Sequence, residues 1–314
     1  MKVCESEIYR GYNEKDIEDI NTYSVCNPKI EADYYTDGFG VKTAFECVPF
    51  VQPNNLIPER IKLPVPDDGF HAETIEYFAL VDSIKRTVSS EIEYCAVEFG
   101  AGWGPWITAS GIIARNNGIK KISLIGVEAH TGRYELMQKH LRNNQFKPIE
   151  WNPSMQKKHL EQCALVFNGV IWGHDGEVFF PQNDITDMGT SASNKAISKD
   201  YRGHRNQYES VSCLTPKTLC KHLSKIHFLH IDIQGAEYEI LKASINWLNK
   251  TVVSIMVATH SRVIEGQIIA LLLKNNWTLL REKPCRVDWQ RTQGDLEGWT
   301  TKDGSQYWVN QIHN

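Results

Sequence analysis

The chain has 314 residues, 41% of them hydrophobic and 10% aromatic, so it is long enough to bury one large core with an appendage. Its net charge of −4 gives no positive field for nucleic acid, and its eight cysteines include no CxxC pair that would indicate a zinc knuckle. No run of about 18 apolar residues and no apolar signal core is found, so we expect no membrane span and a cytoplasmic location.

Residues 1–69 are predicted to form an N-terminal appendage that packs on the main domain or covers its site. This stretch is polar up to Asp68, lacks a lasting hydrophobic period and is interrupted by several prolines. Residues 70–88 then place apolar side chains at helical spacing, which predicts a helix leading into the main domain, residues 70–314.

Strand and helix patterns alternate through the main domain. Apolar, β-branched runs predict strands at residues 94–99, 121–127, 163–172, 227–233 and 252–260. Helical spacing predicts helices at residues 106–116, 133–144, 236–244 and 265–276, and two closing strands are expected at 277–283 and 306–312. This alternation indicates an α/β fold with a mostly parallel sheet covered on both faces.

A polar insert at about residues 181–211 interrupts this alternation. Just before it, Asp175-Gly176 is typical of a hairpin turn. Loops as long as this insert are usually functional lids or disordered segments, and both interpretations stay open. As a lid, the insert would use Lys199, Arg202 and Arg205 to bind an anionic substrate; as a disordered segment it would be a solvated loop.

The stretch "CAVEFGAGWGPW" joins the first predicted strand of the sheet to its helix. Gly100, Gly102 and Gly104 follow Glu98 in an ExGxGxG pattern, and Pro105 stands where a dinucleotide fingerprint has its third glycine. An acid at this place disfavours a pyrophosphate and suits an ammonium group, which indicates S-adenosylmethionine. Glu128, at the end of the second strand, can accept both ribose hydroxyl protons.

The stretch "HIDIQGAEYEIL" at residues 230–241 resembles the FkbM family of S-adenosylmethionine-dependent methyltransferases. Asp232, Gln234, Gly235 and Glu237 match the family's D-(V/I)-(E/Q)-G-x-E signature. "THSRVIEG" at 259–266 and "DGSQYWVN" at 303–310 are similar to later family segments, and the resemblance covers about residues 70–314. It implies a Rossmann-like class I methyltransferase fold, a mostly parallel seven-stranded sheet with a closing antiparallel strand. It also implies O-methylation of a sugar, polysaccharide or polyketide hydroxyl.

The resemblance assigns cofactor-binding residues by position. It places the methionine end of the cofactor at the glycine turn, its ribose at the second strand and its adenine at the third. The residues are Glu98, Gly100, Ala101, Gly102 and Gly104, then Glu128 and Ala129, then Asn168 and Gly169.

Two residues at neighbouring strand ends are expected to carry the chemistry. His260 suits a general base because its ordinary pKa lies near working pH, and Asp232 would orient it or contact the substrate. Metal binding by Asp232 is the less favoured interpretation, because only Glu237 could partner it nearby, and we expect no metal. Arg262, Glu265 and Glu237 are expected to contact substrate; a structural ion pair of Arg262 is an alternative.

Other functions remain as alternatives to an O-methyltransferase of a small molecule or glycan. They are a non-catalytic S-adenosylmethionine-binding protein, a nicotinamide-dependent oxidoreductase and a nucleic-acid methyltransferase. Pro105 counts against an oxidoreductase. The net charge and the absence of an NPPY-like motif count against a nucleic-acid methyltransferase. We expect no nucleic-acid partner, and a homodimer is compatible with the sequence.

Overall fold

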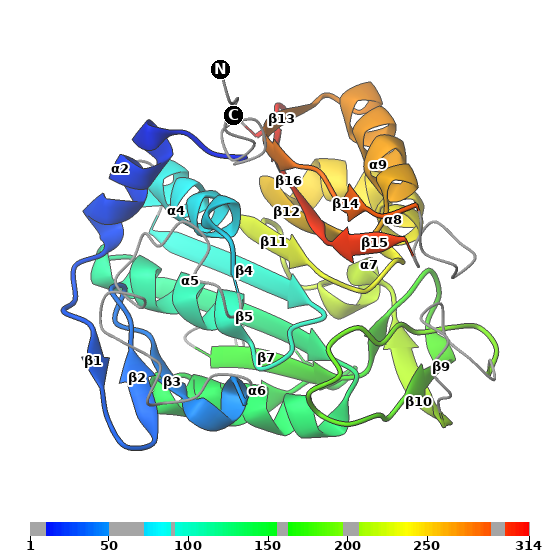
Figure 1. The fold of residues 1–314 in the computed structure, drawn as a ribbon, viewed down its shortest axis with the longest axis horizontal. Helices are drawn as coiled ribbons and strands as arrows, with labels where there is room; N and C mark the ends of the chain where they lie inside the picture. Colours follow the sequence, from blue (N-terminus) through cyan, green and yellow to red (C-terminus); the bar gives the residue numbers. More distant parts are fainter. Residues whose placement is uncertain are drawn as a thin grey trace.

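The computed structural model describes residues 11–49, 72–88, 92–155, 163–196, 207–289 and 299–313. At its centre lies an eight-stranded sheet in the order β13-β16-β12-β11-β4-β5-β7-β6 (Figure 1). In chain order these strands are β4 (Glu93–Phe99), β5 (Lys121–Glu128), β6 (Lys147–Glu150), β7 (Cys163–Asn168), β11 (Phe228–Ile231), β12 (Ser254–Thr259), β13 (Trp277–Lys283) and β16 (Gly304–Asn310).

The strands of this sheet are parallel except for β16, which pairs antiparallel with both β12 and β13. The predicted fold class, a mostly parallel sheet with a closing antiparallel strand, is therefore confirmed. One strand is added to the expected seven, because β6 pairs with β7 at the sheet edge. It is short and contains Pro148, which an edge strand tolerates and which weakens any strand pattern in the sequence.

Helices cover both faces of the sheet (Figure 1). On one face, α4 (Thr74–Val88), α5 (Pro105–Asn116) and α6 (Thr131–Asn143) share a core with the strands. On the other face, α7 (Pro216–Leu219), α8 (Glu237–Thr251) and α9 (Arg262–Lys274) share a second core. Because both faces are buried, the strands are continuously apolar, as parallel strands between helices should be.

A small second sheet lies beside the carboxyl ends of the main strands. It has the order β8-β10-β9, formed by β8 (Val170–Ile171), β10 (Tyr208–Leu214) and β9 (Gly176–Pro181). The predicted hairpin at Asp175-Gly176 is wrong, because β8 and β9 flank β10 and do not pair with each other. The Asp175 carboxylate instead accepts hydrogen bonds from Thr215 N and Thr218 Oγ1, which ties this turn to the chain after β10.

The polar insert connects β9 to β10. These two strands pair antiparallel, with Gly176 opposite Cys213 at one end and Pro181 opposite Tyr208 at the other. Its described first part continues to residue 196. The predicted substrate contacts Lys199, Arg202 and Arg205 lie outside the described residues.

The described N-terminal residues 11–49 pack against the main domain. They form α2 (Glu14–Tyr23), a sheet of β1 (Lys29–Ile30), β2 (Tyr34–Thr36) and β3 (Lys42–Ala44), and the 3-10 turn η1 (Phe45–Cys47). Helix α2 packs on α4, while β3 and η1 contact α6 (Figure 1). Near the other end of the chain, β14 (Arg286–Val287) pairs with β15 (Thr300–Lys302). Among the described helices, none combines the length and the apolar character that crossing a membrane requires.

Candidate functional site

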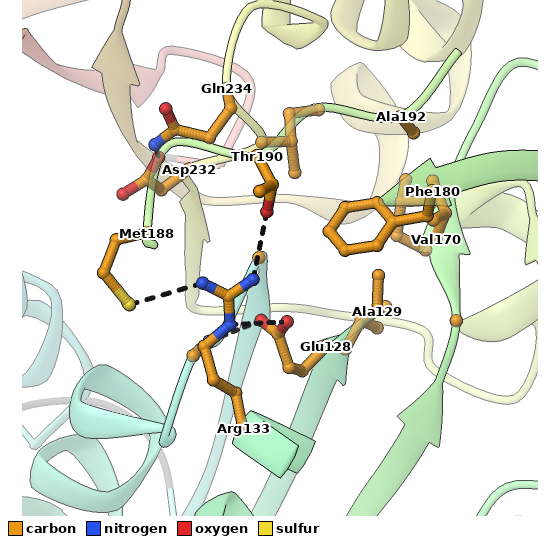
Figure 2. A pocket seen from close by; sticks show the side chains of 16 residues that line it. Glu128, Ala129, Arg133, Val170, Phe180, Met188, Thr190, Ala192, Asp232 and Gln234 are labelled. Carbon is orange, nitrogen blue, oxygen red and sulfur yellow. Dashed lines mark hydrogen bonds and ion pairs between the residues drawn. The ribbon is translucent and has the colours of Figure 1, made fainter. Parts of the chain in front are cut away.

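A cavity that is partly open to solvent lies at the carboxyl ends of β4, β5, β7 and β11. Each of these strands contributes a lining residue at or just after its last position: Gly100, Glu128, Gly169 and Asp232. This is the edge at which open α/β sheets bind their ligands. The insert supplies the opposite wall, with Met188, Thr190 and Ala192 (Figure 2).

The glycine turn is shaped by close backbone approaches. Gly100, Gly102 and Gly104 have φ angles of 74°, 54° and 72°, in the left-handed region that favours glycine. A Cβ on Gly100 would lie 1.7 Å from the backbone oxygen of Asp232, so no larger residue fits between β4 and β11. Gly100 and Gly102 line the cavity as predicted, whereas Gly104 is the N-cap of α5 and Ala101 is buried behind the turn.

Glu98 does not line the cavity, which corrects its expected role as a ligand for the cofactor's ammonium group. Its Oε2 accepts a hydrogen bond of 2.9 Å from Ile107 N in the first turn of α5. Burial raises the pKa of Glu98 well above its ordinary value, despite hydrogen bonds from the helix backbone. The residue therefore caps a helix inside the protein, because its strand position directs it beneath the turn.

Glu128 lines the cavity and is 5% exposed. Its Oε2 accepts a hydrogen bond from Gly102 N at 2.8 Å, and its Oε1 accepts one from His130 N at the same distance. These bonds fix the carboxylate between the glycine turn and the loop after β5. Since a carboxylate can accept about four hydrogen bonds, it keeps lone pairs for a ligand.

Arg133 is a cavity residue that the sequence analysis missed. Its Nε lies 3.3 Å from Glu128 Oε1, and both side chains are almost completely buried. Its Nη2 donates to Thr190 Oγ1 at 3.1 Å (Figure 2), and its Nη1 donates to Asp187 O at 2.9 Å. One guanidinium group thus links the end of β5 to the insert. A cation in the first turn of a helix opposes the helix dipole, and this unusual position was the available signal in the sequence.

The end of β7 departs from the predicted adenine contacts. Gly169 lines the cavity, but Asn168 does not, because its Nδ2 donates to the backbone oxygens of Glu128 and Ala129. Ala129 lines the cavity as expected. The apolar wall next to it comes from Val170 in β8 and Phe180 in β9, strands of the small sheet that had no site pattern in the sequence.

His260, Asp232 and Glu237 come together beside the cavity. His260 Nδ1 lies 2.9 Å from Glu237 Oε1, and its Nε2 lies 3.3 Å from Asp232 Oδ1. Glu237 is fully buried and also accepts hydrogen bonds from Ile233 N and Gly235 N. Of the catalytic pair, only Asp232 lines the cavity, while His260 is 6% exposed behind it. Glu237 therefore orients the histidine ring, the role expected of Asp232.

The protonation of this group also differs from the expectation of a histidine base. Burial favours the neutral ring, but the carboxylates of Glu237 and Asp232 outweigh it and raise the pKa of His260 well above 6.5. Burial likewise opposes the charge of Asp232, yet contact with the His260 ring lowers the pKa of this carboxyl. The His260 ring thus favours the ionised form of Asp232, and Asp232 is the member of the pair that lines the cavity and can accept a proton there.

The other predicted substrate residues lie away from the cavity. Arg262 is exposed and forms a 3.3 Å ion pair with Glu265, the structural alternative left open by the sequence. Glu265 is buried and accepts hydrogen bonds from Cys285 N and Thr259 Oγ1. Glu237 is enclosed behind His260. None of these three lines the cavity, because α8 and α9 direct their first turns toward the backbone of the preceding loops.

Comparisons with known proteins agree with this architecture. Residues 99–276 match the model of the methyltransferase FkbM domain, a range that holds every residue described as lining the cavity. A protein from Jannaschia sp. (strain CCS1) named as a methyltransferase is 27% identical over 270 residues, covering 82% of this chain and 89% of that protein.

Two solved structures are similar at low sequence identity. The FkbM methyltransferase of Methylobacillus flagellatus KT has a TM-score of 0.40 at 9% identity, covering 75% of this chain and 54% of that chain. The C-terminal domain of precorrin-6Y C5,15-methyltransferase from Rhodobacter capsulatus also has a TM-score of 0.40, at 10% identity, covering 78% of this chain and 96% of that chain.

Proposed function

Because the chain belongs to the FkbM family of S-adenosylmethionine-dependent methyltransferases, we propose that it methylates a hydroxyl oxygen of a sugar, a glycan or a related secondary metabolite. The main support for this proposal is the position of Asp232. Its ionised carboxylate contacts His260 and forms the cavity wall next to Gly100. A hydroxyl group must lose its proton as it is methylated, and this carboxylate supplies an acceptor at the right edge of the sheet.

The walls of the cavity suit the cofactor in their chemistry. Gly100 and Gly102 allow a ligand to approach the backbone closely, and Glu128 offers carboxylate oxygens to a ribose diol. Val170 and Phe180 provide an apolar wall for a purine ring. The carboxylates of Glu128 and Asp232 also favour a ligand that carries positive charge.

When bound, S-adenosylmethionine supplies a methyl group on a sulfonium, activated for in-line displacement. Asp232 accepts a hydrogen bond from the acceptor hydroxyl and thereby directs its oxygen toward the methyl carbon. As the oxygen–carbon bond forms and the carbon–sulfur bond breaks, the hydroxyl proton passes to the Asp232 carboxylate. His260 holds Asp232 in place from behind, and Glu237 holds His260.

The test is an acceptor screen with the purified full chain and S-adenosylmethionine. Free sugars, sugar nucleotides, oligosaccharides and hydroxylated polyketides are offered beside a set of amines, and S-adenosylhomocysteine release is measured. Fragmentation mass spectrometry of the product locates the new methyl group. We expect it on oxygen, and methyl transfer confined to nitrogen acceptors would refute the proposal.

Variants separate cofactor binding from transfer. Asp232→Asn should abolish turnover and leave S-adenosylmethionine binding, measured by calorimetry, nearly unchanged. Glu128→Gln should weaken that binding about 10- to 100-fold, because a hydrogen-bonded charge is lost in a buried site. Glu150→Gln, at an exposed position at the end of β6, is the matched control. Cofactor binding that depends on Glu128, without transfer to any acceptor, would favour the non-catalytic alternative.

A further inference from the structure

We infer that the acceptor end of the cavity holds a divalent cation between His260, Asp232 and Asp303, with Glu237 orienting the histidine. The inference rests on the proposed function, because the cation would bind the acceptor oxygen. Sequence analysis favoured a site without metal, since only Glu237 stands near Asp232 in the chain. In the fold, the loop after β12 brings His260 to Asp232, and the start of β16 brings Asp303.

The distances between donor atoms suit a shared ion. His260 Nε2 lies 3.3 Å from Asp232 Oδ1 and 3.9 Å from Asp303 Oδ2. Nitrogen and oxygen ligands bind small divalent cations at about 2.0–2.2 Å, so adjacent ligand atoms in an octahedral site are about 3 Å apart. The side chain of Asp303 is 60% exposed, so its carboxylate has room to turn toward an ion that His260 and Asp232 hold.

The histidine is held in the manner of a metal ligand. Its Nδ1 is bound by Glu237, and its Nε2 is buried and has no hydrogen-bond partner among the described residues. Metal-binding histidines commonly donate their other ring N–H to a carboxylate, which fixes the ring. Glu237 has that position, and its own hydrogen bonds to Ile233 N and Gly235 N fix it in turn.

The charge around His260 is unbalanced. Asp232, Glu237 and Asp303 surround one imidazole, and within the described ranges none of the three carboxylates forms an ion pair with a lysine or an arginine. Three negative groups beside one ring are stabilised by a cation of higher charge than a proton. Carboxylate oxygens with one imidazole nitrogen suit Mg²⁺ or Mn²⁺, the cations that prefer oxygen ligands.

The cation would add a second contribution to hydroxyl activation. Since Asp303 is partly exposed and Asp232 lines the cavity, open coordination positions face the acceptor. A hydroxyl oxygen bound there loses its proton more readily, because the cation stabilises the developing alkoxide. Vicinal hydroxyl groups, as in sugars, could occupy two positions and be held in a fixed orientation.

Manganese is the probe for this site. The full chain, stripped with EDTA and dialysed, is titrated with Mn²⁺, and free Mn²⁺ is followed by electron paramagnetic resonance. We expect one bound ion per chain, with a nitrogen coupling in the spin-echo spectrum that His260→Gln removes. Asp232→Asn and Asp303→Asn should each weaken binding by about 10- to 100-fold or more. Asp33→Asn, at an exposed position before β2, is the matched control, and circular dichroism checks that each variant is folded.

The outcomes test the cation site and the proposed function separately. Absence of Mn²⁺ binding, or binding that Asp232→Asn and Asp303→Asn leave unchanged, overturns the site; hydroxyl methylation that persists in EDTA would then leave the proposed function intact. Mn²⁺ binding that these variants abolish supports the site. If such a protein transfers methyl groups to no hydroxyl acceptor, the proposed function fails and the cation site stands.

Discussion

Glu98 is the second-last residue of β4, just before the glycine turn, yet it faces the interior of the protein. Its side chain is 1% exposed, and it accepts a hydrogen bond from the backbone of α5. Burial raises the pKa of this carboxyl, and the negative charges of Asp232 from the end of β11 and Glu76 from α4 raise it further. The group thus prefers its neutral form in the folded protein more than in the unfolded chain.

This preference makes the stability of the protein depend on pH in a defined direction. A carboxyl whose folded pKa is raised contributes stability that is fully present below its unfolded pKa and is lost as pH rises through the folded value. Glu98→Gln keeps the hydrogen-bond acceptor and removes the titration. The free energy of unfolding of this variant, relative to the unsubstituted protein, should therefore rise between about pH 5 and about pH 8. Urea unfolding at both pH values measures it.

The exposed Glu150 provides the control for this measurement, because Glu150→Gln should show the same relative stability at both pH values. An unchanged relative stability of Glu98→Gln between these pH values would mean that Glu98 is already ionised in the folded protein, as a ligand of an ammonium group should be.

The location of residues at strand ends could be predicted from the sequence, whereas the hydrogen-bond partners of their side chains could not. Gly100, Glu128 and Asp232 follow or end apolar strands, and parallel strands end at one edge, so their place at the cavity follows from the pattern. The bonds of Glu98 to α5 and of Glu237 to His260 depend on side-chain direction and on the exact start of a helix. Sequence spacing does not define either one.

At the scale of elements, Arg133 joins α6 to the insert. The ion pair with Glu128 fixes the guanidinium group, which then donates to Asp187 O and Thr190 Oγ1 across the cavity. A lysine has one charged nitrogen and cannot keep this planar arrangement of donors. The Arg133 side chain thus helps to hold the segment 187–190 over the glycine turn, where Met188 lies next to Gly102.

Arg133→Lys should therefore loosen this segment and shorten the residence of the cofactor. We expect dissociation of S-adenosylmethionine to become about tenfold faster, since most changes of affinity at one site appear in the dissociation rate. Stopped-flow fluorescence measures this rate, and hydrogen exchange at residues 187–190 should increase in parallel. Arg142→Lys, exposed in the last turn of the same helix, is the control. Equal dissociation rates for Arg133→Lys and the unsubstituted protein would contradict a holding role.

The elements themselves differ in how clearly the sequence indicates them. The buried strands and the amphipathic helices match their patterns within a few residues, because hydrophobic periodicity reports burial directly. Most of strand β10 falls in the predicted polar insert, since its first five positions, Tyr208–Ser212, are intermediate or exposed and all but Val211 carry polar side chains. Its pairing with β9 is a long-range contact that no local pattern encodes.

At the scale of the whole molecule, the described N-terminal residues pack against α4, α6 and β13, and part of them, including Tyr35 and Val48, packs against Trp103 behind the glycine turn. The ion pair of Asp16 in α2 with Arg281 in β13 joins the two ends of the sequence, with Arg281 Nε donating to Asp16 Oδ2 at 2.6 Å. Among residues 11–49 none lines the cavity. These contacts favour packing on the main domain over covering the site, and the division at residue 69 remains a proposal.

Asp16→Asn distinguishes these two roles of the appendage. Asp16 is 2% exposed and also caps its own helix through Asn13 N, so losing its charge should lower the free energy of unfolding by about 2 kcal/mol. Asp19→Asn breaks only the pair with the exposed Lys85 and should cost about 0.5 kcal/mol or less. Calorimetric titration of both variants with S-adenosylmethionine should give the affinity of the unsubstituted protein, because neither residue approaches the cavity. Weaker cofactor binding by folded Asp16→Asn, but not by Asp19→Asn, would mean that the appendage reaches the site and helps to close it.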